Sequence, residues 1–249
     1  MTKPFPGTPS RNVILIGGSQ GSIPVLKRLL GDFPAGLHAA VGVTVHRSPT
    51  FQSSLAEILA AHASIPVIEA RDGQLFEQGS AYLAPPDHHM QFRGGAIRLD
   101  RGPKQQFVRP AIDVMFTSGA TSYGPRVIGV LLTGNLSDGV AGLIHIKQHG
   151  GLSLVQEPAE AEAPAMPTNA LAYDDVDAVF KLESAASLLA QLVAGVSLEQ
   201  ASRISGSRRL PRKHRPQSPV GQQRNSMTVG GYEAAGAGSF AELRRLRRR

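Results

Sequence analysis

The chain has 249 residues, of which 41% are hydrophobic and 18% charged, and it contains 27 glycines, 18 prolines and no cysteine. These values exclude a collagen-like or wholly disordered chain, and the lack of cysteine excludes disulfides, thiolate metal sites and a cysteine nucleophile. The longest apolar runs fall far short of the roughly 20 residues that span a bilayer, and residues 1–10 lack the apolar stretch of a signal peptide. We therefore expect a cytoplasmic protein.

Positive charge is concentrated at the C-terminal end of the chain. Residues 1–202 carry 14 Lys and Arg against 17 Asp and Glu, a net charge of −3, whereas residues 203–249 carry 12 against 2, a net charge of +10. The basic segment has few large apolar residues, so burial cannot offset its ordering entropy. We predict an N-terminal extension at 1–10, one folded domain at 11–195 and a basic, mostly disordered tail at 196–249.

Two strand–turn–helix units open the predicted domain. Residues 12–17 form a β-branched apolar run typical of a strand buried on both faces, and it ends in a Gly-rich turn. Apolar residues then recur at helical spacing over 23–30. The strand pattern returns at 39–45, and a second helical spacing follows at 51–59.

The same alternation continues to the end of the domain. The later elements include a small hairpin across Gly94-Gly95. In chain order they are strands at 65–68, 81–84, 90–92 and 97–99, a helix at 110–123, a strand at 127–133, a helix at 140–147, strands at 152–156 and 179–180, and a helix at 183–193. Strands that alternate with helices predict an α/β fold, a doubly wound, mostly parallel sheet with helices on both faces.

Three polar turns follow the carboxyl ends of predicted strands, and they contain Ser19, His46 and Asp138. Ligands of doubly wound sheets bind beyond these strand ends. The turn at 17–21, Gly-Gly-Ser-Gln-Gly, fits the G-x-S-x-G pattern, in which glycines leave a serine hydroxyl exposed above a strand. A Gly-rich turn before a helix is equally suited to binding phosphate. The turn alone therefore indicates a nucleophile, an anion site or a plain structural turn.

The other two residues also allow more than one interpretation. His46 could accept the proton of Ser19, although a single loop histidine is more often only solvated. Asp138 could cap a helix or orient the imidazole of His46. Their common location at one edge of the predicted sheet favours a Ser-His-Asp site. The order Ser, His, Asp disfavours a lipase-type α/β-hydrolase, in which the acid precedes the histidine.

A specific set of motifs is spread over residues 11–193. The motifs are Gly17-Gly18-Ser19-Gln20-Gly21, His46, Val67-Ile68-Glu69-Ala70-x-Asp72-Gly73, Ala81-Tyr82-Leu83-Ala84-Pro85-Pro86-x-His88-His89, Arg109-Pro110-Ala111-Ile112-Asp113-Val114-x-Phe116, Leu132-Thr133-Gly134 with Ser137-Asp138-Gly139 and Gly142-Leu143, and Met166-Pro167. In this order and combination they resemble the catalytic domain of the CheB chemotaxis protein-glutamate methylesterases.

The resemblance implies a doubly wound α/β fold and a serine esterase that uses no metal and no cofactor. By the family pattern, Ser19 is the nucleophile, His46 the base and Asp138 the orienting acid. The substrate implied is a γ-glutamyl methyl ester on the cytoplasmic signalling helices of a methylated chemoreceptor or similar signalling protein. Some members of the family also deamidate receptor glutamine.

Several residues depart from the family pattern. The usual Thr after the serine is Gln20, and Ser22 replaces a Gly. Asn135-Leu136 replaces Met-Gly, and Ala165 replaces the Gly before Met-Pro. Because backbone donors survive changes of side chain, we hypothesise an oxyanion hole formed by the N–H groups of Gln20 and Asn135. The changed turns bear on rate and substrate choice more than on reaction class.

The resemblance begins within a dozen residues of Met1, so we expect a stand-alone catalytic domain without the receiver domain that usually precedes it. Either constitutive low activity or control by a separate regulatory protein would follow. The alternative function is a catalytically weak or inactive signalling or binding module, motivated by Gln20 and Asn135. A nucleotide-binding protein is a third interpretation, but no acidic residue closes the predicted second strand to hold a ribose.

Three further stretches carry clustered charges. Asp87-His88-His89 is a poor metal site because the two histidines are adjacent, and Asp174-Asp175-x-Asp177 lacks the Gly and Glu of a calcium loop. We expect the latter to be a solvated acidic turn. The basic tail, with clusters at 208–215 and 244–249, is expected to be solvated, with anionic lipid, a receptor or nucleic acid as the alternative partners.

Overall fold

The computed structural model describes residues 10–47 and 54–211. Its centre is an eight-stranded sheet in the order β10-β9-β8-β7-β1-β2-β4-β3, in which every neighbouring pair is parallel except β10 with β9. The strands are β1 (Val13–Gly18), β2 (Ala40–Val45), β3 (Val67–Glu69), β4 (Ala81–Leu83), β7 (Val127–Leu131), β8 (Leu152–Gln156), β9 (Ala178–Phe180) and β10 (Arg208–Arg209). The predicted mostly parallel sheet is confirmed.

The alternation of side chains along β1 shows why both faces of the sheet are covered. Ile14 and Ile16 belong to the apolar cluster on one face, while Val13 and Leu15 belong to the cluster on the other. All four are at most 2% exposed. Because successive residues of a strand point to opposite faces, a continuous apolar run requires cover on both sides.

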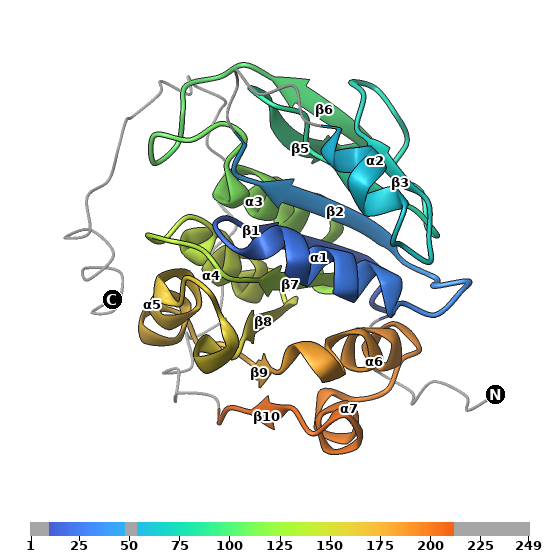
Figure 1. Ribbon diagram of the computed structural model, residues 1–249, viewed down its shortest axis with the longest axis vertical. Helices are drawn as coiled ribbons and strands as arrows, with labels where there is room; N and C mark the ends of the chain where they lie inside the picture. The colour runs from blue at the N-terminus through green and yellow to red at the C-terminus, as the bar shows by residue number, and fades with distance from the viewer. Residues whose placement is uncertain (1–9, 48–53, 212–249) are drawn as a thin grey trace, which may run out of the picture. The chain divides into compact units, whose positions relative to one another are not determined.

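Helices supply this cover in two layers (Figure 1). One face carries α1 (Ser22–Gly31), α2 (Leu55–Ala60), α6 (Leu182–Val193) and α7 (Leu198–Ser205). The other face carries α3 (Ile112–Tyr123), α4 (Val140–Gln148) and α5 (Ala165–Tyr173), together with the hairpin of β5 (His89–Arg93) and β6 (Ala96–Asp100). This arrangement confirms the doubly wound fold and the predicted hairpin.

The order of the strands places a crevice at the centre of the sheet. From β1 the chain runs outward through β2 to one edge, and it returns through β7 on the other side of β1. The helices that follow β1 and β7, namely α1 and α4, lie on opposite faces. Such a switch point leaves a crevice at the carboxyl ends of the two strands, which is where ligands of these folds bind.

The folded region extends further than the sequence indicated. Residues 196–211 were expected to begin the disordered tail, but they contain α7 and β10. Ser197 caps α7 through the amide of Gln200, and Ala201 is fully buried. α7 was not predicted, because its short amphipathic pattern lies within a polar, basic stretch of the sequence.

Two other expectations differ from the structure. α5 was not predicted, because its sequence carries no amphipathic pattern. Asp174 and Asp177 are 3% and 5% exposed, so the acidic turn is buried rather than solvated. Asp177 accepts a hydrogen bond from the amide of Ser153 and pairs with Lys147, which compensates its burial.

Some predictions fall outside the described residues. They concern most of the N-terminal extension at 1–10, the start of the helix expected at 51–59, and the basic tail from 212 onward with its alternative partners. Within residues 10–47 and 54–211, none of the helices is both long enough and apolar enough to cross a membrane.

The packing of α7 leads to a prediction about the domain boundary. A chain ending at Gly195 should have a free energy of unfolding lower by about 1 kcal/mol or more than a chain ending at Pro211, because α6 loses the apolar partner that α7 provides. Urea denaturation followed by circular dichroism measures the difference. Equal midpoints for the two chains would contradict the prediction.

Candidate active site

Ser19 is held in a tight turn between β1 and α1. Its amide donates to the carbonyl of Thr133 at 3.0 Å, and its carbonyl accepts from the amide and the hydroxyl of Ser22 at 3.0 and 2.6 Å. Gly21, with φ of 75°, provides the left-handed step into the helix. The Gly-rich motif thus fixes Ser19 above the carboxyl end of the central strand.

A second loop presses closely against Ser19. A Cβ atom at Gly134 would lie 2.8 Å from the Cβ of Ser19 and 2.5 Å from the Cε of Met166. Only glycine allows this approach. The loop after β7 is thereby packed against the serine, and both lie in the crevice at the switch point of the sheet.

The structure brings together the three residues that the sequence placed at one edge of the sheet. The Nδ1 atom of His46 lies 3.0 Å from the Oγ of Ser19, and its Nε2 atom lies 2.7 Å from the Oδ2 of Asp138. A carboxylate only accepts hydrogen bonds, so Nε2 carries the proton and Nδ1 is free to accept from the serine hydroxyl. The side chain of His46 is 17% exposed and that of Asp138 only 2%.

The carboxylate of Asp138 is oriented by the first turn of α3. Its Oδ2 atom accepts from the amide of Ile112 at 2.7 Å, and its Oδ1 atom accepts from the amide of Asp113 at 3.0 Å. Amides at a helix N-terminus stabilise a negative charge. Asp138 does not cap α4, whose N-cap is Gly139, so the capping role considered for it is not the one found.

A network that sequence reasoning missed ties the loops of the site together. The hydroxyl of Thr133 donates to the carbonyl of Gln20 at 3.0 Å and accepts from the amide of Ala163 at 2.8 Å. The amide of Thr133 donates to the Oε1 of Gln156, whose side chain is buried at the end of β8. Thr133 belongs to the Leu132-Thr133-Gly134 motif, but the sequence gave no reason to assign it a role, and the only sequence signal for Gln156 is its place at the end of an apolar strand.

The two residues of the hypothetical oxyanion hole face each other. The Nδ2 of Asn135 donates to the Oε1 of Gln20 at 2.7 Å, and both residues are exposed. Within the part of the chain that the structure describes, the backbone N–H groups of Gln20 and Asn135 have no hydrogen-bond partner. Unpaired backbone amides are the kind of donor that stabilises an oxyanion, and these two lie on the loops that carry and contact Ser19.

A second carboxylate, Asp113, adjoins Asp138. It accepts from the amide of Gly142 at 2.7 Å and from the Nε2 of Gln106 at 2.9 Å. Burial, and then the negative charge of Asp138, raise the pKa of Asp113 to about 7, against the lowering effect of these hydrogen bonds. The sequence placed Asp113 in a motif but gave no reason to assign it a role.

Each of the two adjacent histidines is hydrogen-bonded to a backbone carbonyl. A ring nitrogen of His88 bonds to the carbonyl of Pro86 at 2.9 Å, and one of His89 bonds to that of Pro103 at 3.0 Å. Among the residues described, no group of three or more His, Asp or Glu side chains is arranged to hold a metal ion.

The fold and the site together define a class of protein: a doubly wound α/β domain with a hydrogen-bonded Ser-His-Asp chain at its switch point. Residues 14–189 match the family model of the CheB methylesterase. The chain therefore belongs to the CheB methylesterase family.

Similar proteins agree with this assignment. A protein-glutamate methylesterase/protein-glutamine glutaminase of Methanosarcina mazei is 36% identical over 194 residues, which cover 75% of this chain and 53% of the relative. One of Pyrococcus abyssi is 37% identical over 182 residues, covering 72% and 50%. The chain thus spans about half the length of these relatives. The crystal structure of the Thermotoga maritima CheB methylesterase catalytic domain matches with a TM-score of 0.69 and 30% identity, covering 74% of this chain and all of that one.

The raised pKa of Asp113 predicts how stability depends on pH. A folded-state pKa above the unfolded value means that the folded protein holds the proton more tightly, so the contribution of Asp113 to the free energy of unfolding should fall as pH rises from about 4 to 8. Asp113→Asn should weaken this decline, whereas Asp32→Asn, at an exposed position, should not. Urea denaturation at several pH values measures both. An unchanged pH profile in Asp113→Asn would contradict the prediction.

Proposed function

We propose that the protein is a cytoplasmic protein-glutamate methylesterase. Its substrate is a γ-glutamyl methyl ester on a methylated chemoreceptor or a related signalling protein, and glutamine side chains are deamidated by the same chemistry. The observation that carries this proposal is the hydrogen-bonded chain from Ser19 through His46 to Asp138. Membership of the CheB methylesterase family and the names of the relatives support the choice of substrate.

Acylation follows from the direction of these hydrogen bonds. The Oγ of Ser19 attacks the ester carbonyl while its proton passes to Nδ1 of His46, and Asp138 stabilises the imidazolium through Nε2. The tetrahedral intermediate collapses by breaking the C–OCH₃ bond, and His46 returns the proton to the leaving oxygen. Methanol departs, and the γ-carbonyl of the substrate glutamyl residue is bonded to Ser19.

Deacylation uses the same residues, with water as the nucleophile and Ser19 as the leaving group. Water gives a proton to Nδ1 of His46 as its oxygen attacks the acyl carbonyl, and the proton then goes to Oγ as the bond to Ser19 breaks. The product is a free glutamate side chain. In both steps, the amides of Gln20 and Asn135 are proposed to bind the negatively charged oxygen, a contribution that is typically worth about 100- to 1,000-fold in turnover per donor.

The nucleophile provides the first test. Ser19→Ala should abolish methanol release from a methylated receptor signalling fragment while leaving the circular dichroism spectrum and the melting temperature nearly unchanged. The side chain is only partly buried, and the turn is held by backbone bonds of Ser19 that alanine retains. Methanol release by the variant would remove Ser19 from the mechanism.

A serine-reactive fluorophosphonate tests the same site without a protein substrate. The native chain should be labelled at Ser19, because His46 activates its hydroxyl. A chain that serves only as a binding module would not be labelled. Failure of the native chain to react, with the fold intact, would therefore favour the inactive-module alternative.

The oxyanion donors give a separate prediction. Gln20→Ala and Asn135→Ala should each reduce the kcat for methanol release by less than about tenfold, because the proposed donors are backbone amides that the substitutions keep. Steady-state methanol release measures the effect. A loss of about 100-fold or more in either variant would show that its side chain, rather than its amide, carries the function.

A further inference from the structure

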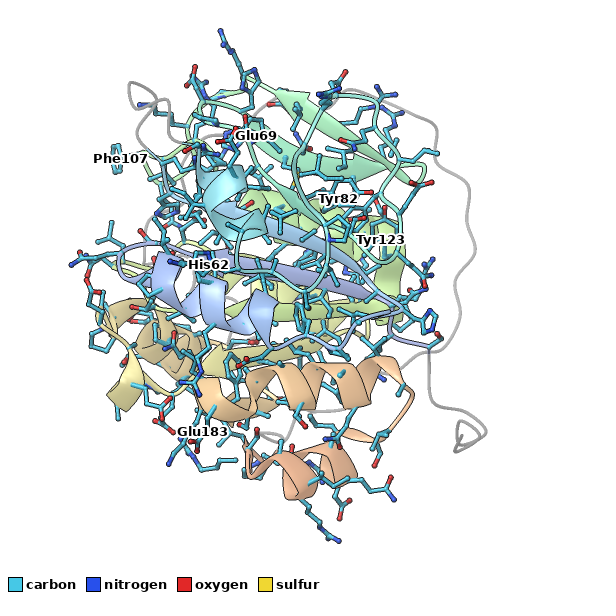
Figure 2. The ribbon with its side chains drawn as sticks, turned by 45° about the vertical axis from the view of Figure 1, so that its right-hand side comes forward. His62, Glu69, Tyr82, Phe107, Tyr123 and Glu183 are labelled. Atoms are coloured by element: carbon cyan, nitrogen blue, oxygen red, sulfur yellow. The ribbon has the colours of Figure 1, made fainter. Side chains whose placement is uncertain are left out.

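Two large apolar side chains project into solvent beside the site. Phe107 is 93% exposed and Leu136 is 67% exposed, and among the described large hydrophobic residues Ile204, at 69%, and Leu75, at 59%, are similar to Leu136. In Figure 2 the ring of Phe107 stands out from the ribbon, whereas that of Tyr82, which is 2% exposed, lies inside it. Burial of an apolar side chain stabilises the folded state, and neither of these exposed side chains contributes that stabilisation.

The backbone at these positions is also strained. Phe107 and Leu136 have φ values of 67° and 64°, and Gln106 has a φ of 47°. The left-handed region costs a residue with a Cβ atom about 1 kcal/mol or more, and such conformations persist where surrounding contacts enforce them. Gln106 and Phe107 are the central residues of a tight turn that two backbone hydrogen bonds between Gln105 and Val108 close, at 3.2 and 2.9 Å. The Nδ2 of Asn169 donates to the carbonyl of Leu136.

One hydrogen bond joins the two loops that carry these side chains. The hydroxyl of Ser137 donates to the Oε1 of Gln106 at 3.1 Å. Phe107 follows Gln106, and Leu136 precedes Ser137, whose next neighbour is Asp138. The two apolar side chains therefore lie on adjoining loops at the rim of the site.

The loop that carries Phe107 is basic. Residues 101–109 contain Arg101, Lys104 and Arg109 and no acidic residue. Arg109 and Arg101 both form ion pairs with Asp87, at 2.5 and 3.7 Å. Lys104 is exposed and has no ion-pair partner among the described residues. The rim thus combines apolar side chains with an uncompensated positive charge.

We propose that Phe107, Leu136 and Lys104 form the docking surface for the segment of the protein substrate that carries the scissile ester, and that this segment is acidic and amphipathic. The inference rests on the proposed function. An ester on a protein reaches Ser19 only if the flanking residues cross this rim, where apolar side chains cover Phe107 and Leu136 and carboxylates face Lys104. Burial supplies affinity, and the charge supplies specificity and speed of association.

Binding is tested apart from catalysis. The probe is a fluorescent 20-residue amphipathic peptide with carboxylates beside its apolar face and one central glutamyl methyl ester. In a Ser19→Ala background, Phe107→Ala should raise the Kd measured by anisotropy at least fivefold, Leu136→Ala should also raise it, and Lys104→Glu should raise it mainly at low salt. Ile204→Ala, on α7, is the matched control and should leave the Kd unchanged.

Catalysis is measured with Ser19 intact on a small ester, p-nitrophenyl acetate. Phe107→Ala should hydrolyse it within about twofold of the native rate, since the ester is too small to reach the rim. Failure of the native chain to hydrolyse any ester would contradict the proposed function. The docking surface would then be judged from peptide binding alone, which does not require hydrolysis. A Kd for the peptide that does not change in Phe107→Ala, or that rises equally in Ile204→Ala, would overturn the docking surface.

Discussion

The position of one buried carboxylate determines whether the site exists. Asp138 is held by the first two amides of α3 and faces His46 at 2.7 Å. These amides replace the water that a carboxylate loses on burial, so the residue remains a hydrogen-bond acceptor for the imidazole. The register of α3 against the loop after β7 is therefore as important to the chemistry as the three side chains themselves.

The loops are fixed by packing and by polar contacts that need close approach. Gly134 lets the loop after β7 touch Ser19, and the hydroxyl of Thr133 joins the loops after β1, β7 and β8. Catalytic groups act efficiently only when their geometry is fixed before the substrate binds. Two of the residues that depart from the family pattern, Gln20 and Asn135, lie on the exposed side of this framework. A third, Ser22, is fully buried, and its hydroxyl donates to the carbonyl of Ser19.

The rim and the interior of the site show opposite uses of apolar residues. Inside, Ile112 and Met166 are fully buried and support the loops. Outside, Phe107 and Leu136 project into solvent from positions with a positive φ. A small-molecule esterase has no need of such a rim, but an enzyme that acts on a protein must bind the chain around the reacting group. The apolar rim and the Ser-His-Asp chain thus support the same proposal, an esterase that acts on a protein.

The sequence by itself determined the alternation of strands and helices and the edge at which Ser19, His46 and Asp138 gather, because buried parallel strands have continuous apolar patterns and Gly-rich turns mark their ends. It did not reveal α5 or α7, whose patterns are weak, short or masked by their neighbours. Nor did it reveal that the carboxyl groups of Asp113 and Asp138 lie near each other, or that Phe107 is exposed. These depend on contacts between residues far apart in the chain, such as Gln106 with Ser137, and only the tertiary structure decides such contacts.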